Sequence, residues 1–302
     1  MAQGLHSLDP AVLDRLASLE LVARSVVDGF MSGGHRSGRL GSSVEFAQHR
    51  PYVIGDELRR VDWRVYARND RLVVKQFVEE TDFACHLLVD RSESMQYGSE
   101  AWTKFDYARW CAAALAHLVI GERDTSGLVL FDAKERVKVP PSSGDRQKHA
   151  IWSALEAAQP SGPTGVGGVL QWFAGRLRKR GIVAIYSDFF DDLPSVVEGL
   201  RRLRHDGHEP ILFQVLDPLE LSFDIARLVR LDGLEGAGML KVDPKALRQA
   251  YVEEITAHNR ELARHAAAMG VDYVQLDTSR TLEAALTTYL AHRKARARGG
   301  RR

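Results

Sequence analysis

Asp90, Ser92 and Ser94 place one carboxylate and two hydroxyls at alternate positions of the segment HLLVDRSESM, directly after an apolar run. Alternate residues of an extended chain project to the same side, so these oxygens can face one ligand. Asp188 follows a second apolar run (GIVAIYS), and Thr164 lies in the glycine-rich turn PSGPTGVGG. Because all five donors are oxygens, we expect a hard divalent cation, Mg²⁺ first, with Mn²⁺ or Ca²⁺ as alternatives.

Such a ligand set also indicates what the ion could do. Two carboxylates, Asp90 and Asp188, and otherwise neutral hydroxyls leave a divalent ion short of ligands and of negative charge. An acidic side chain from another protein could complete the shell, so the metal would bridge two proteins. The pattern contains no evident pair of nucleophile and base, and we therefore predict no catalytic residue.

The elements that must position these residues begin at residue 84, where apolar runs alternate with amphipathic helices. This alternation is typical of a parallel sheet that is covered on both faces, so we predict a doubly wound, mostly parallel α/β fold. In such folds ligands bind at the carboxyl ends of the strands, where the strand order reverses. The predicted strands are 84–90, 126–131, 181–187, 210–216 and 271–276, and the predicted helices are 104–121, 145–158, 166–179, 194–205, 244–269 and 281–292.

The rest of the chain is predicted more coarsely. We expect a helix over residues 10–30, a mobile or ligand-ordered glycine-rich loop at 31–43, a short strand at 72–77 and, within 217–243, a hairpin on the edge of the sheet. The predicted organisation is an N-terminal region (1–80) that packs on the core, an α/β domain (81–292) and a disordered basic tail (293–302).

Composition limits the classes of function. The chain has 41 Lys and Arg against 40 Asp and Glu, a formal charge of +1, so no overall field favours nucleic acid or an anionic membrane. The glycine- and arginine-containing segment 33–41 lacks the interleaved aromatics of a nucleic-acid site. No apolar run reaches the ~20 residues that span a bilayer. We expect a cytoplasmic protein in which Cys85 and Cys111 are buried, reduced thiols.

Two segments resemble a known family. Asp-x-Ser-x-Ser after the first strand, a later loop threonine and a Ser-Asp that ends another strand resemble the metal-ion-dependent adhesion site of von Willebrand factor A (VWA) domains. Upstream, HRPYVIGDELRRVDWRVYARNDRLVVKQFVEE resembles the signature of the MoxR-associated family known as domain of unknown function 58. The positions that carry this second resemblance are Arg50, Tyr52, Gly55, Asp56, Arg59, Asp62, Trp63, Ala67 and Arg68.

The resemblance extends from about residue 16 to at least 217 and implies a VWA-like, Rossmann-like fold. It also implies a role beside MoxR-type AAA+ ATPases in the maturation of client proteins or in the insertion of metal cofactors. The sequence departs from the adhesion-site pattern after Thr164, where glycines follow, and Asp191 or Asp192 could assist as ligands.

Several residues have a structural interpretation beside the functional one. Ser and Asp after strands commonly cap helices, although the helix predicted at 104 begins too far on for Ser92 or Ser94 to cap it. The charged residues between Arg50 and Arg68 can form an ion-pair network that fastens the N-terminal region to the sheet, with Trp63 and Tyr66 as packing anchors, or they can form a partner-binding surface. His86, inside an apolar strand, fits a core residue better than a ligand.

Two classes of function follow. The leading hypothesis is a non-catalytic, metal-dependent protein-binding module that serves as an adaptor or co-chaperone for a MoxR-type AAA+ ATPase. The alternative is a Mg²⁺-dependent hydrolase or phosphotransferase that uses Asp90 or Asp188 as nucleophile or base. The sequence has no GxxxxGK[ST] pattern, which argues against nucleotide hydrolysis by the chain itself.

Overall fold

The structure is a computed structural model of the chain. It describes residues 45–53, 56, 61–78, 84–121, 124–177, 180–224, 229–232, 239–242, 244–280 and 282. The helix predicted at 10–30, the glycine-rich segment 31–43, nearly all of the helix predicted at 281–292 and the basic tail lie outside these residues, as do Gly55 and Arg59. The described residues before residue 84 form one compact unit, and the described residues from Ala84 onward form a second.

The smaller unit is built on an antiparallel pair of strands. β1 (Glu45–Pro51) pairs with β2 (Val73–Val78), which confirms the strand predicted at 72–77, and α3 (Trp63–Asn69) lies in the connection between them. Buried Val61 forms an isolated antiparallel bridge with buried Val74, so the connection returns to the strand pair just before α3 begins.

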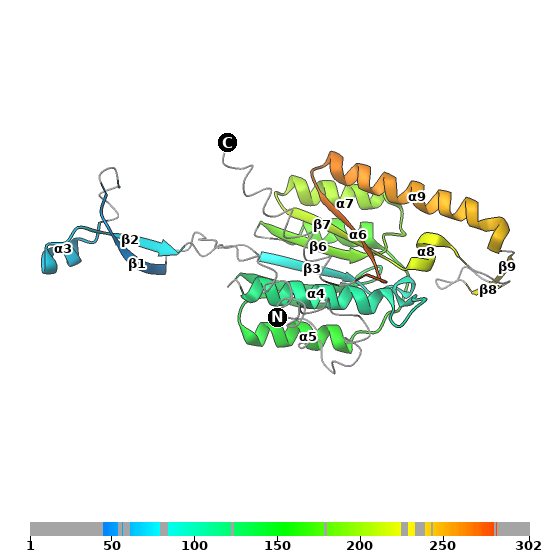
Figure 1. Cartoon of the computed structure of the whole chain (residues 1–302), viewed down its shortest axis with the longest axis horizontal. Coiled ribbons are helices and arrows are strands. Elements are labelled where there is room, and N and C mark those ends of the chain that lie inside the picture. The colour runs from blue at the N-terminus through cyan, green and yellow to red at the C-terminus, as the bar shows by residue number, and fades with distance from the viewer. Residues whose placement is uncertain are drawn as a thin grey trace, which may run out of the picture. The chain divides into compact units, whose positions relative to one another are not determined.

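The larger unit is built on a six-stranded sheet with the strand order β10-β7-β6-β3-β4-β5 (Figure 1). Every neighbouring pair is parallel except β4 and β5, which are antiparallel. The chain therefore winds outward in both directions from a switch point between β3 and β6, as in doubly wound folds, and the predicted α/β class is confirmed. The strands are β3 (Ala84–Asp90), β4 (Thr125–Phe131), β5 (Glu135–Ser142), β6 (Gly181–Ser187), β7 (Glu209–Leu216) and β10 (Asp272–Asp277).

Helices cover both faces of this sheet. On one face lie α4 (Lys104–Gly121) and α5 (Asp145–Ala157), and on the other lie α6 (Val166–Ala174), α7 (Leu193–His205) and α9 (Pro244–Ala268) (Figure 1). Every residue of β3 and of β6 is buried, as expected for central strands between two helical layers. Among the described helices, none is both long and apolar enough to cross a membrane.

Some elements differ from the sequence-based predictions. β5 was not predicted; it contains Pro140 and Pro141, which an edge strand tolerates because its outer N–H groups need no partner strand. α6 ends at Ala174 instead of residue 179, with Gly175 as its C-cap. The predicted hairpin exists as β8 (Val229–Asp232) and β9 (Met239–Val242), but it forms a separate two-stranded sheet and is not an edge of the large one.

Candidate metal and partner-binding site

The predicted ligands meet at the switch point of the sheet. Asp90 is the last residue of β3, and Asp188 follows Ser187, the last residue of the neighbouring strand β6. The carboxyl ends of these two strands lie where the winding direction reverses, which is the edge at which doubly wound sheets bind ligands. The strand order therefore supports the predicted position of the site.

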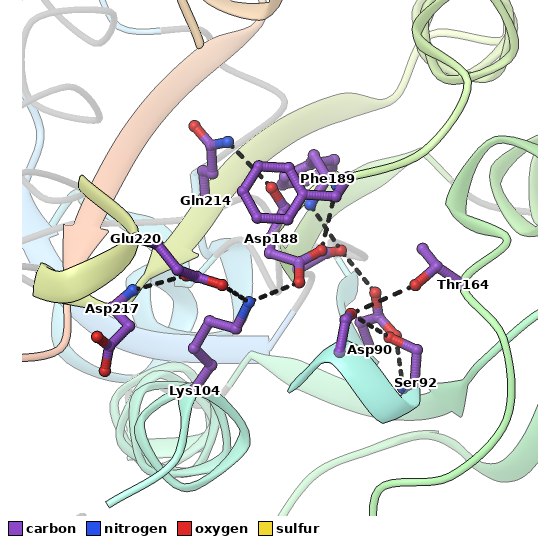
Figure 2. A network of polar contacts seen from close by, with 12 residues as sticks. Asp90, Ser92, Lys104, Thr164, Asp188, Phe189, Gln214, Asp217 and Glu220 are labelled. Carbon is purple, nitrogen blue, oxygen red and sulfur yellow. Dashed lines mark hydrogen bonds and ion pairs between the residues drawn. The ribbon is translucent and has the colours of Figure 1, made fainter. Parts of the chain in front are cut away.

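Hydrogen bonds connect four of the five predicted ligands in one cluster (Figure 2). The Oδ1 atom of Asp90 accepts a bond from the Ser92 backbone N–H at 2.8 Å. The Ser92 and Ser94 hydroxyls lie 3.1 Å apart, and the Ser94 hydroxyl lies 3.4 Å from that of Thr164. Asp90 and Ser92 are fully buried, whereas Ser94 and Thr164 are partly exposed, so the cluster extends from the sheet toward solvent.

The loop after β3 explains why the serines are directed into this cluster. A short 3-10 helix, η2 (Glu93–Gln96), follows at once; it was not predicted, and it begins close enough for Ser92 to occupy its N-cap position. Ser92 occupies the N-cap position of η2, yet its side chain makes no capping bond to that helix. The capping interpretation is therefore wrong for Ser92, whose hydroxyl contacts Ser94 instead.

The glycine-rich turn brings Thr164 to the cluster by close backbone packing. Gly162 has a φ of +85°, a left-handed conformation that favours glycine, and its carbonyl accepts a 2.8 Å bond from the Glu93 N–H. A Cβ atom on Gly165 would lie 2.6 Å from the Cα atom of Ala133. The glycines that depart from the adhesion-site pattern thus allow the turn to lie against the neighbouring loops.

Asp188 is held by a lysine that the sequence analysis did not identify. Its Oδ2 atom accepts a 2.8 Å ion-paired hydrogen bond from Lys104 Nζ, and its Oδ1 atom accepts a 3.1 Å bond from the Phe190 N–H. Lys104 is the first residue of α4, is 1% exposed and also pairs with Glu220 at 2.7 Å. Between Asp188 and Phe190, Phe189 is buried with a left-handed φ of 58°.

The electrostatics of the site favour a cation. Burial, followed by the negative charge of Asp188, raises the pKa of Asp90 to about 7, although hydrogen bonds from Ser187 and Ser92 oppose the shift. Ser187 makes its bond to the Oδ2 atom of Asp90 at 2.6 Å. Burial alone lowers the pKa of Lys104, but the charges of Asp188 and Glu220 outweigh it and raise that pKa above its ordinary value. A divalent ion would relieve the cost of ionised Asp90.

The donor atoms gathered at the site are carboxylate and hydroxyl oxygens. Within the described residues, no three or more His, Cys, Asp or Glu side chains form a group that could hold a metal. A site rich in thiolate or imidazole is thus absent from this part of the chain, whereas an Asp, Ser and Thr set is present. Ser94 and Thr164, being partly exposed, leave a side on which a further ligand could approach.

The two alternative acidic ligands have structural roles. Asp191 Oδ2 accepts a 3.0 Å bond from the Gly167 N–H in the first turn of α6. Asp192 is the N-cap of α7 and accepts a 3.0 Å bond from the Ser195 N–H. Both carboxylates thus satisfy N–H groups at helix starts, which favours Asp188 as the second acidic ligand.

In the smaller unit, the described residues of the predicted charged network make both ion-pair and helix-capping contacts. Arg50 forms a two-bond ion pair with Asp56 at 2.6 and 2.8 Å, while Asp62 caps α3 by accepting bonds from two backbone N–H groups. Trp63 is 54% exposed and meets Tyr66 edge to face. Tyr52 is half-buried and its N–H donates to the Leu72 carbonyl, and Arg68 lies exposed in the last turn of α3.

His86 and the two cysteines, which could also bind metals, lie in the core. His86 is buried and meets Phe173 edge to face, and burial lowers its pKa to about 4, so it is neutral near pH 7. Cys85 and Cys111 are buried, free cysteines, as predicted. None of the three belongs to the polar cluster around Asp90.

The strand order and the polar cluster at its switch point define a doubly wound α/β domain with a candidate oxygen-donor site. The chain belongs to the family described as "Protein of unknown function DUF58", whose model matches residues 48–261. It is 30% identical over 300 residues to the uncharacterized protein Rv1480 of Mycobacterium tuberculosis, and the match covers 97% of this chain and 93% of that protein.

Two solved structures show weaker likeness. The conserved hypothetical protein BatB from Bacteroides thetaiotaomicron aligns with a TM-score of 0.46 and 14% identity, covering 70% of this chain and 98% of BatB. The VWA domain of SpRpn10 aligns with a TM-score of 0.41 and 15% identity, covering 68% of this chain and 93% of that domain.

Proposed function

We propose that this protein is a non-catalytic protein-binding module whose site holds a divalent cation, Mg²⁺ first, through Asp90, Ser92, Ser94, Thr164 and Asp188. A carboxylate of a partner protein would complete the shell of the ion. The observation that carries this proposal is the convergence of Asp90, Ser92, Ser94 and Thr164 at the switch point, with Asp188 on the neighbouring strand end.

Burial and exposure within the site support a bridging role. The two carboxylates are fully buried, so they can anchor an ion, but they are only two negative charges, one of which already pairs with Lys104. The partly exposed hydroxyls of Ser94 and Thr164 contribute no charge. A bound ion would retain positive charge on its exposed side and would attract an acidic side chain.

For the partner we propose a MoxR-type AAA+ ATPase, with client proteins as the acidic ligands. The support is the resemblance of residues 49–80 to the MoxR-associated signature and the membership in the matched family. In the smaller unit, the exposed Trp63 and Tyr66 offer an aromatic surface for such a partner, because aromatic residues are enriched in the centres of protein interfaces.

The test is affinity isolation from the native cell extract with the full chain as bait, in Mg²⁺ and in excess chelator. We expect an AAA+ ATPase or acidic clients to be recovered in Mg²⁺ and lost in chelator or with Asp90→Ala. Asp145→Ala is the matched control, because Asp145 is an exposed carboxylate on α5. The same recovery in all four conditions would reject metal-dependent binding, and metal-dependent phosphoester turnover abolished by Asp90→Asn would favour the hydrolase.

A further inference from the structure

Lys104 is a buried cation inside the proposed metal site. Its Nζ atom lies 2.8 Å from Asp188 Oδ2 and 2.7 Å from Glu220 Oε1, and the side chain is 1% exposed. Figure 2 shows it reaching Asp188 from one side while Asp90, Ser92 and Thr164 lie on the other. A metal ion bound by those oxygens would therefore share the Asp188 carboxylate with the Lys104 ammonium group.

The lysine is fixed by contacts that need no metal. Glu220 belongs to α8 (Pro218–Ser222), where its Oε2 atom accepts a 3.0 Å bond from the Asp217 N–H as part of a capping box. Asp217 in turn accepts bonds from the backbone N–H and the hydroxyl of Ser99. The Phe190 ring lies 5.3 Å from Nζ. Lys104 thus has a defined position set by α8 and by the loop before α4.

The net charge around Lys104 indicates how this side chain affects the binding of a metal ion. Asp188 and Glu220 carry two negative charges and Lys104 one positive charge, so these three buried side chains have a net charge of −1. Without the lysine the net charge would be −2. Like charges repel strongly in a poorly solvated site, and the ammonium group must therefore weaken metal binding.

We propose that Lys104 is a built-in counter-cation that keeps the metal affinity of the site low, so that the ion is held firmly only when a partner carboxylate adds its charge. This rests on the proposed function, because it presupposes the metal site. Thermodynamic linkage makes this effect reciprocal: the factor by which the partner carboxylate raises the metal affinity is the factor by which the metal raises the affinity for the partner. Metal and partner would then bind together, and the metal-free domain would keep its site ordered.

The experiment measures the Mn²⁺ dissociation constant of the full chain by the electron paramagnetic resonance of free Mn²⁺, in a series of variants that changes only the charge of the cluster. Lys104→Met gives −2 and should bind Mn²⁺ about tenfold tighter, and Glu220→Gln gives 0 and should bind about tenfold more weakly. The double variant returns to −1 and should bind within about threefold of the original protein. Lys148→Met, which removes a lysine of a surface pair on α5, should change nothing.

The outcomes separate this inference from the proposed function. If Asp90→Ala binds Mn²⁺ as the original protein does, the metal site itself is wrong. If Asp90→Ala abolishes binding while Lys104→Met binds equally or more weakly, Lys104 only positions Asp188 and the counter-cation inference is overturned. If Lys104→Met fails to fold, as circular dichroism would show, Glu220→Gln decides, and its binding Mn²⁺ as tightly as the original protein would overturn the inference.

Discussion

Asp90→Asn should make the metal-free domain more stable and at the same time remove its response to metal. Asp90 is fully buried, and burial together with the charge of Asp188 raises its pKa from 3.8 to about 7. At a pH above both values, ionised Asp90 costs the folded state about 4 kcal/mol relative to the unfolded chain. A neutral amide of the same size avoids this cost.

Part of that gain is lost in rearranged hydrogen bonds. In the original protein the Ser187 hydroxyl donates a hydrogen bond to the Asp90 carboxylate. In the Asp90→Asn variant the amide oxygen could still accept from the Ser92 N–H, but the amide NH₂ group would face the Ser187 hydroxyl and could not accept its bond. Losing one such bond costs about 1–2 kcal/mol. We therefore expect a net gain of about 2 kcal/mol at pH 8, or roughly 4–8 °C in melting temperature for a domain of this size.

The sign of the pH dependence gives a second check. Because the folded pKa of Asp90 is raised, its contribution to stability is complete below pH ~4 and is lost as the pH rises through about 7. The advantage of the Asn variant should therefore be largest at pH 8 and should be lost as the pH falls, so that near pH 4 the hydrogen-bond cost of about 1–2 kcal/mol leaves the variant less stable than the original protein. Urea unfolding in excess chelator measures both, with Asp145→Asn as an exposed control.

Adding Mg²⁺ completes the test. A ligand that binds only the folded state raises the free energy of unfolding, so the original protein should gain stability with Mg²⁺ concentration and Asp90→Asn should not. An Asn variant that is less stable than the original protein at pH 8 in chelator, or whose advantage is the same at pH 4 and pH 8, would refute the reasoning.

Three further predictions concern the framework of the site, each measured by urea unfolding. The pKa of His86 is lowered to about 4, so about 3 kcal/mol of stability present above pH 6.5 should be lost as the pH falls to 4, and His86→Gln should show a smaller loss. Asp217→Ala should cost about 2 kcal/mol or more, because this buried carboxylate accepts bonds from both a helix start and a distant loop. Gly167→Ala should cost about 1–3 kcal/mol, because its Cβ would lie 2.6 Å from the Ser195 carbonyl carbon, whereas Gly168→Ala, with nothing within 4 Å, should gain up to about 1 kcal/mol.

The central strands could be predicted because each buried strand leaves an uninterrupted apolar run. The strands predicted at 84–90 and 181–187 agree with β3 and β6 in both bounds, and they place Asp90 and Asp188 at their ends. The hydroxyls after β3 followed from alternate spacing alone. These features depend on residues close in sequence, where pattern and structure are directly connected.

Lys104 could not be predicted, because its partners are distant in the chain. Asp188 lies 84 residues away and Glu220 lies 116 residues away. In the sequence it is a lysine at the start of a helix, where a solvated side chain is the ordinary expectation. The one available signal was that the first residue of the helix after β3 must lie at the same edge of the sheet as Asp90.

The edge strand β5 has a consequence for the behaviour of the protein in concentrated solution. Exposed sheet edges can recruit strands from other molecules and begin aggregation. β5 presents Arg136 and Lys138, and of the adjacent Pro140 and Pro141 the one that faces the free edge lacks the N–H group that an added strand would need. The register of β5 against β4 is also irregular, and such irregularities bend and twist a strand, so β5 is a poorer template for an added strand. Replacing both prolines with threonine should therefore leave the sheet intact but make the protein more prone to self-association on this side.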